Sequence, residues 1–103
     1  MASVPGTLAS LISSCEQIAS CIQTRESEAV IAEVLGQTMK ACQSANTHQQ
    51  TAEIKTIVSQ LDVAVGTWKK VWPHLGHQEE FRNAVAREAK SWAKRLVPLA
   101  KES

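Results

Sequence analysis

His74 and His77 are the nearest approach to a metal-binding pair in this chain. Zinc takes three or four ligands at about 2.0–2.3 Å. The remaining histidine, His48, lies at the far end of the same predicted helix, and the cysteines lack the spacing of a metal site. We therefore interpret the pair as two histidines in a tight turn, and expect no metal or other cofactor.

The three cysteines are the candidate nucleophiles. Cys15 and Cys42 fall at the centres of apolar stripes, where a free cysteine behaves as a small hydrophobic residue. A helical hairpin offsets these two by about 9 Å along its axis, which is beyond disulfide reach. Cys21 lies off its stripe, so we expect an exposed, reactive thiol. No histidine is expected beside any of them, so no catalytic residue is assigned and the chain is not expected to be an enzyme.

Carboxylates do not cluster, but one lies at an edge of the expected core. Glu88 flanks a stripe that contains Phe81 and Trp92, and Arg95 shares its flank. An acid with a raised pKa is one interpretation, and a boundary salt bridge is the preferred one.

Tryptophans gather near the junction of the last two predicted helices, at Trp68, Trp72 and Trp92. Such residues usually pack in a core, although they can also line a cleft. A small-ligand carrier or enzyme with a site near these tryptophans and Glu88 is therefore the second alternative function.

Basic residues are concentrated toward the C-terminal end. Residues 1–66 carry three Lys or Arg against six acidic residues, and residues 67–103 carry eight against four. The cations that form or extend one face of the last helix are Lys69, Lys70, Arg87, Lys90, Lys94 and Lys101. Such a face can contact phosphates, although no aromatic residues for base stacking are interleaved with it. Binding to nucleic acid or an anionic surface is the first alternative function.

The first predicted helix has an unusual polar face. Its residues are small or uncharged, and Glu16 is the single charge on it. The candidate contact residues are Ser10, Ser13, Ser14, Gln17 and Ser20. Uncharged side chains cost less to desolvate than lysines, so this face is a candidate contact surface for a partner protein or for a second copy in a homodimer.

These residues must be positioned by α-helices. Residues 54–72 place large apolar side chains at steps of three and four, which is the period of an amphipathic helix. The chain lacks tyrosine and has one phenylalanine, four glycines and three prolines. This scarcity of turn-forming and aromatic strand-forming residues disfavours an all-β fold.

Helix-start signals divide the chain into four helices. Thr7 is the expected N-cap of a helix over 7–23, and Ser27 is the expected N-cap of a second helix that ends at residues 44–46. Thr47 and Gln50 resemble a capping box that opens a third helix over 48–72. The fourth helix is expected to begin at His77.

Helix-stop signals are fewer. Asn46 is expected to end the second helix, and Pro73 to stop the third at Trp72. Pro98 is expected to bend or fray the last turn of the fourth helix. Gly36 is expected on the outer side of the second helix.

The pattern predicts one all-α domain over residues 1–103, an antiparallel up-and-down four-helix bundle. Because no glycine or proline marks the break at residues 24–27, a three-helix arrangement with residues 7–44 as one long helix remains the alternative. No membrane span or secretory signal is expected, and reduced thiols favour a cytoplasmic protein. The function expected first is a small, non-catalytic protein-interaction or adaptor module that acts through a helix face or through self-association.

Overall fold

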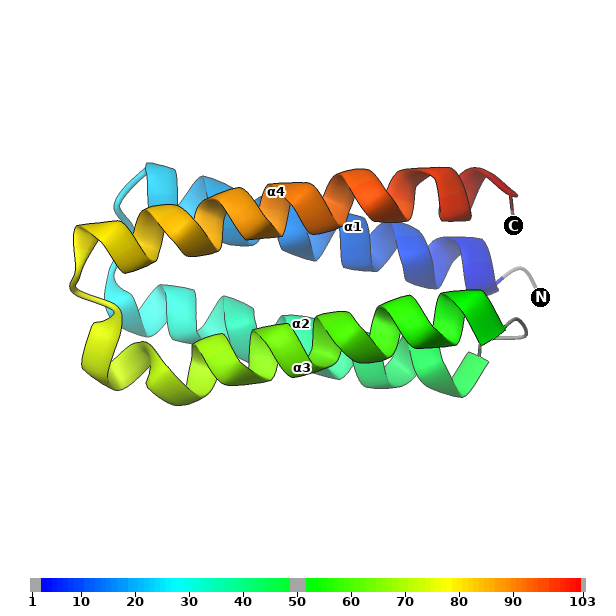
Figure 1. Cartoon of the computed structure of the whole chain (residues 1–103), viewed down its shortest axis with the longest axis horizontal. Coiled ribbons are helices and arrows are strands. Elements are labelled where there is room, and N and C mark those ends of the chain that lie inside the picture. Colours follow the sequence, from blue (N-terminus) through cyan, green and yellow to red (C-terminus); the bar gives the residue numbers. More distant parts are fainter. Residues whose placement is uncertain (1–2, 49–51, 103) are drawn as a thin grey trace.

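A computed structural model describes residues 3–48 and 52–102 of the chain, with side chains over residues 8–45 and 52–100. The described part contains four α-helices: α1 (Ser3–Gln23), α2 (Glu28–His48), α3 (Ala52–Leu75) and α4 (Glu79–Glu102). They run alternately up and down along a molecule 40 Å long (Figure 1). The all-α four-helix prediction is confirmed, and the single long helix over residues 7–44 is excluded.

The turn between α1 and α2 is a Schellman motif built without glycine. Arg25 adopts a left-handed backbone conformation with φ of 58°. Its N–H donates to the carbonyl of Ile22 at 3.2 Å, and the N–H of Glu26 donates to the carbonyl of Cys21 at 3.0 Å. These two bonds satisfy carbonyls that the end of α1 leaves unpaired. Ser27 then caps α2 as predicted, because its Oγ accepts the N–H of Val30 at 3.2 Å.

Replacing Arg25 with glycine should therefore stabilise the protein by about 0.5–1 kcal/mol, because a left-handed conformation strains any residue that has a Cβ atom. The lost ion pair with Glu79, 3.5 Å long with both side chains largely exposed, contributes little. Denaturant unfolding measures the change. Arg25→Ala is the matched control, since it removes the same ion pair and keeps the Cβ atom. Equal stabilisation by both variants would contradict this explanation.

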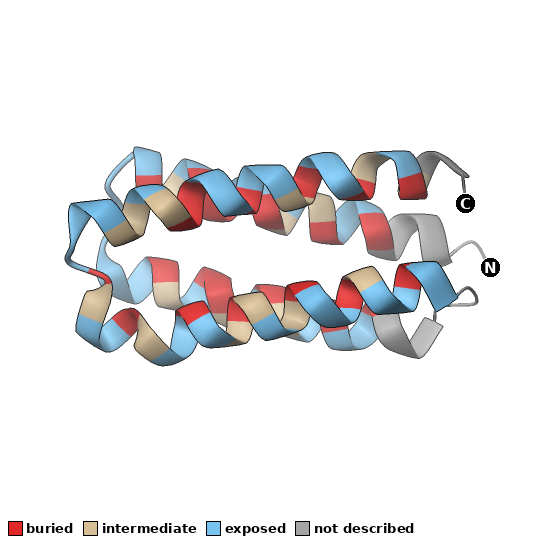
Figure 2. Ribbon diagram, in the orientation of Figure 1, coloured by how far each residue is buried: buried red, intermediate tan, exposed pale blue. Residues whose placement is uncertain are grey.

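The helices form two layers, α1 with α4 and α2 with α3, and the buried side chains lie between them (Figures 1 and 2). Among the described helices, α1 and α4 pack against each other most extensively. Both helices bury small side chains, Ala19 on α1 and Ala86, Ala89 and Ala93 on α4, which permit this packing. Although α3 and α4 are consecutive, their backbones make few close approaches.

Gly36 on α2 and Gly66 on α3 lie where these two helices pack against each other. A Cβ atom at Gly36 would lie 3.3 Å from Cε of Lys69, and one at Gly66 would lie 3.7 Å from Cε of Met39. Each helix thus passes a long side chain over a glycine of the other. The prediction that Gly36 lies on the outer side of α2 is wrong, because α3 covers it.

The two turns at one end of the bundle are joined by Arg82. Its guanidinium donates to the carbonyl of Gly76 at 3.2 Å and to that of Glu26 at 3.4 Å. It also lies 5.9 Å from the centre of the Trp72 ring system. The indole N–H of Trp72 donates to the carbonyl of Glu28 at 3.0 Å. This network, which we call the Arg82 corner, ties α2, α3 and α4 to the turn after α1.

Some predicted helix boundaries are wrong. Thr7 lies inside α1, so it is not the N-cap. Asn46 and Thr47 lie inside α2, and the predicted capping box therefore does not open α3. Its other member, Gln50, lies outside the described residues. Asn and Thr are only mildly unfavourable within a helix, so without glycine or proline they do not stop α2.

Pro73 does not stop its helix as predicted, and Pro98, which was expected to bend or fray the last turn of the fourth helix, does not end that helix either. Pro73 lies within α3, which continues to Leu75, and Pro98 lies within α4, which continues to Glu102. A proline removes one N–H donor. Near a helix end the free energy lost with that hydrogen bond is smaller than the free energy gained by burying Trp72, which is 2% exposed.

The fourth helix does not begin at His77 as predicted. It begins two residues later, with two glutamates whose negative charge is favoured by the N-terminal end of the helix dipole.

Candidate functional site

The outer seam between α1 and α4 contains two adjoining hollows of about 750 and 360 Å³. The first is lined by Gln23, Glu80, Asn83, Ala86, Arg87 and Lys90. The second shares Gln23 and Lys90 and adds Glu16, Ser20, Ala93, Lys94 and Val97. Because the hollows share two residues, we treat them as one feature, the α1–α4 groove.

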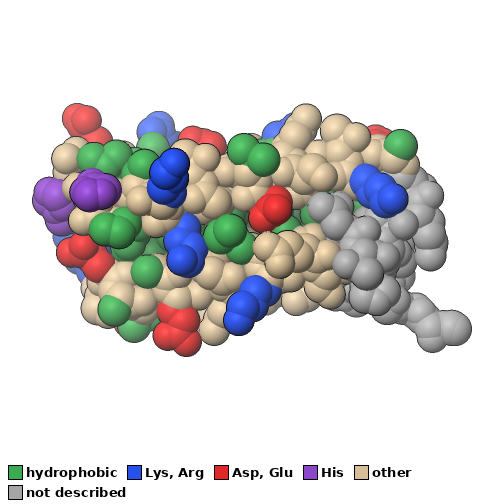
Figure 3. All heavy atoms as spheres, turned by 90° about the horizontal axis from the view of Figure 1, so that it is seen from below, with side chains coloured by type: hydrophobic (Ala, Val, Ile, Leu, Met, Phe, Trp, Pro, Cys, Tyr) green, Lys and Arg blue, Asp and Glu red, His purple; other side chains and the backbone are tan. Residues whose placement is uncertain are grey.

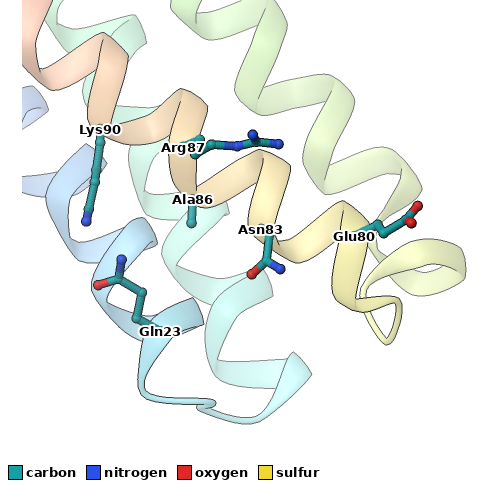
Figure 4. Close-up of a pocket in the computed structure, with 6 residues that line it drawn as sticks. All are labelled: Gln23, Glu80, Asn83, Ala86, Arg87 and Lys90. Atoms are coloured by element: carbon teal, nitrogen blue, oxygen red, sulfur yellow. The ribbon is translucent and has the colours of Figure 1, made fainter.

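Helical spacing explains why these residues meet. On α4 the lining residues recur at steps of three and four, so they occupy one side of the helix. Figure 4 shows Asn83, Ala86 and Lys90 pointing toward α1, where Gln23 faces them, whereas the side chains of Glu80 and Arg87 point away from that helix. The floor is small and apolar, since Ala86 and Ala93 are buried. The groove thus has an alanine floor and long polar side chains along its sides.

Three cations follow the α4 side of the groove. Arg87, Lys90 and Lys94 are exposed, and none of them forms an ion pair with a carboxylate in the described part of the chain. Glu16 and Glu80 line the same hollows without neutralising the three cations. The groove is therefore weakly positive and has cationic side chains free to bind an anionic partner.

The structure brings together only part of the uncharged face predicted on α1. Ser20 lines the α1–α4 groove beside Lys90 and Lys94. Ser10, Ser13 and Gln17 are exposed outside it, and Ser14 is half-buried. Ser20 is thus the one candidate contact residue that meets the basic side of α4.

The basic face predicted across the last two helices is divided by the fold. Arg87, Lys90 and Lys94 belong to the α1–α4 groove, but Lys69 lines a separate hollow between α2 and α3. Lys70 is exposed on α3, and the side chain of Lys101 lies outside the described residues. The prediction that Lys69 extends the basic face of α4 is wrong, because that side of α3 meets α2.

The layer formed by α2 and α3 shows no comparable surface of one charge. Figure 3 shows this layer, where Lys or Arg side chains alternate with Asp or Glu over its described part. Among residues whose side chains are described, the histidines are His74 and His77, at the end of the bundle that carries the turn between α3 and α4. His74 and His77 are exposed, and the described residues include no group of three His, Cys, Asp or Glu side chains able to hold a metal ion.

All three cysteines are free thiols whose ionisation is disfavoured. Burial raises the pKa of Cys15 to about 12, with a further contribution from the Glu16 charge. Burial also raises the pKa of Cys42 to about 12, with smaller contributions from Asp62 and Cys15.

Cys21 differs from its expected state. It is half-buried rather than exposed, and burial followed by the charge of Glu26 raises its pKa. Because the thiolate is the nucleophile, the environment makes this thiol less reactive than a free cysteine. No feature of these three sites activates a thiol.

The tryptophan region is mostly core. Trp68 and Trp72 are buried, at 6% and 2% exposure. Trp92 is half-buried and is covered by the guanidinium of Arg95, 4.5 Å from the ring centre. Glu88 is exposed. The observed partner of Arg95 is therefore an aromatic ring, and the residues proposed for a ligand cleft are largely occupied in packing.

Two groups of residues escaped sequence reasoning. Arg82 was not singled out, although it joins the two turns. Asn83, Ala86 and Ala93 were assigned no role in a site, although their spacing with Lys90 places them on one side of α4. That spacing was visible in the sequence, but the identity of the helix packed beside it was not.

No protein-family model, curated protein or solved structure matches this chain. In the part of the chain that the structure describes, no helix combines the length and apolar character needed to cross a membrane. The function must therefore be argued from the groove itself.

Proposed function

We propose that this protein is a small, non-catalytic interaction module that binds a segment of a partner protein along the α1–α4 groove. One observation carries the proposal: the fold joins a side of α1 that bears Ser20, Gln23 and Glu16 to the cationic side of α4, above a floor of alanine. An apolar floor with a polar rim is the usual anatomy of a protein interface.

The reactive groups support binding rather than catalysis. The thiols of Cys15 and Cys42 are buried with pKa values raised to about 12. The carboxylates of Glu16 and Glu80 line different hollows of the groove, and neither belongs to a paired acid–base arrangement. A surface that presents fixed cations and small apolar side chains is suited to recognition.

The same residues favour a protein segment over nucleic acid. A phosphate backbone that followed Arg87, Lys90 and Lys94 would also approach Glu16 and Glu80. Those carboxylates would repel it, and an alanine floor offers no surface for stacking bases. A polypeptide can instead place apolar side chains on the floor and place its acidic side chains selectively.

Affinity capture of the partner from the native source tests this proposal, using variants that carry the same bulky substitution inside or outside the groove. Ser20→Trp fills the groove, whereas Val63→Trp adds the same ring on α3 at a residue already 70% exposed. We expect wild type and Val63→Trp to retain the same partner, and Ser20→Trp to lose most of it. Circular dichroism verifies that each variant is folded.

A third variant separates the groove from the rest of the α1 face. Ser13→Arg combined with Gln17→Glu alters exposed residues outside the groove and should leave capture unchanged. Light scattering on the wild type distinguishes a second copy of this chain from another protein. Full retention of the partner by folded Ser20→Trp would overturn the proposal.

A further inference from the structure

We infer that the occupant of the α1–α4 groove is an acidic amphipathic helix. This inference rests on the proposed function, because it names the kind of segment that the groove would bind. It follows from three features of the groove: its walls, its length and the register of its cations.

The walls favour a helical occupant. Both sides of the groove are α-helices whose backbone groups are already hydrogen-bonded along their own axes, so no strand edge is available to pair with an extended peptide. A helix satisfies its own backbone groups. The small side chains of Ala86 and Ala93 on the floor allow a third helix to approach closely, at the 8–10 Å or so that is usual between packed helices.

The length of the groove matches a helix of ordinary size. Its α4 side extends from Glu80 to Val97, which corresponds to about 26 Å at 1.5 Å per residue. A helix of about 17 residues, or nearly five turns, spans the same distance. This length gives the partner several side chains for the alanine floor.

The register of the cations specifies the charge of the partner. Arg87, Lys90 and Lys94 are separated by three and four residues, so they follow one side of α4. If the acidic residues of a second helix also recur at steps of three and four, that helix can place a carboxylate beside each of these cations. Such pairs add electrostatic complementarity while the apolar side of the partner covers Ala86 and Ala93.

A second copy of this chain fits the groove less well. In a symmetric dimer through the groove, the cations of α4 would approach the same cations of the other copy. On α1, the side that meets the groove supplies Glu16 as its single acidic residue. A partner whose acidic residues follow one side of a helix is the better complement.

Labelled model helices provide a direct test. The probe is an alanine-rich peptide of about 18 residues, long enough to retain some helicity, with three glutamates at spacings of three and four. Its counterpart carries glutamines at those positions. Fluorescence anisotropy should show the acidic peptide binding at least about tenfold more tightly than its counterpart, equivalent to about 1.4 kcal/mol. Raising the ionic strength from about 0.1 to about 1 M should weaken this binding, since the Debye length shortens from about 10 to about 3 Å.

Two triple variants locate the binding. The combination Arg87→Gln, Lys90→Gln and Lys94→Gln should weaken binding of the acidic peptide by at least about tenfold. The combination Lys40→Gln, Lys55→Gln and Lys70→Gln removes the same charge from exposed residues of α2 and α3, and should change the affinity less than about twofold. Circular dichroism confirms that both variants fold.

Several outcomes would overturn this inference: equal binding of the two peptides, equal weakening by the two triple variants, or tighter binding of a double-stranded oligonucleotide at the same cations. If one of these outcomes occurred and Ser20→Trp still abolished capture of the native partner, the inference of an acidic helix would fail but the proposed function would not. If the native partner were also captured by folded Ser20→Trp, the inference and the proposed function would both fail.

Discussion

Trp68→Ala should lower the free energy of unfolding by about 3–5 kcal/mol, a large share of the stability of a domain this small. Trp68 lies on α3, and its indole is 6% exposed within the core. Truncation removes buried apolar surface and leaves a cavity that rigid neighbouring helices can only partly fill. Urea unfolding followed by circular dichroism measures the loss.

The control for this experiment lies on the same helix. Val63 is 70% exposed, so Val63→Ala should change the free energy of unfolding by less than about 0.5 kcal/mol. A loss below 1 kcal/mol or so for Trp68→Ala would show that the α3 stripe does not face the core.

Gly76→Ala should lower the free energy of unfolding by about 1–3 kcal/mol. A Cβ atom at Gly76 would lie 2.7 Å from Cε2 of Trp72 and 2.7 Å from the carbonyl oxygen of Trp72. The second contact is with backbone, so the turn itself must move. That movement would disturb the bond from Arg82 to the Gly76 carbonyl and weaken the Arg82 corner.

Gly66→Ala is the matched control, because it makes the same chemical change at an ordinary distance. Its Cβ atom would lie 3.7 Å from Cε of Met39, and the residue is in the middle of α3. The better helix propensity of alanine should therefore stabilise the protein by up to about 1 kcal/mol. The thermal unfolding temperature should fall for Gly76→Ala and rise for Gly66→Ala. A lower unfolding temperature for both variants would contradict the packing around these two glycines.

The spacing of apolar residues predicted the helices, because a helix that buries one side must repeat apolar residues at steps of three and four. The apolar residues at steps of three and four in α3 include Ile54, Leu61, Val65 and Trp72, and all four are buried. The turn after α1 could be predicted from its polar residues, although Arg25 occupies the left-handed position that glycine usually takes. Helix ends were harder, because a single proline such as Pro73 is tolerated when tertiary packing holds the residues around it.

The groove could be predicted only in part. Exposed cations at Arg87, Lys90 and Lys94 followed from their position opposite the apolar stripe. The side of α4 that packs against α1 could not be predicted, because the residue pattern within one helix does not specify which helix lies beside it. The same ambiguity explains Lys69, whose flank of α3 packs against α2 rather than extending the basic side of α4.

The close pairing of α1 with α4 has a kinetic consequence. These helices are joined through the whole of α2 and α3, so their contacts have a large separation in sequence. Closing such a long loop costs chain entropy before any of these contacts forms, which slows folding relative to bundles built from adjacent hairpins. During synthesis α1 leaves the ribosome before α4. Until α4 has emerged, Ala19 and its apolar neighbours on α1 lack the surface that buries them, and the α1–α4 groove does not exist.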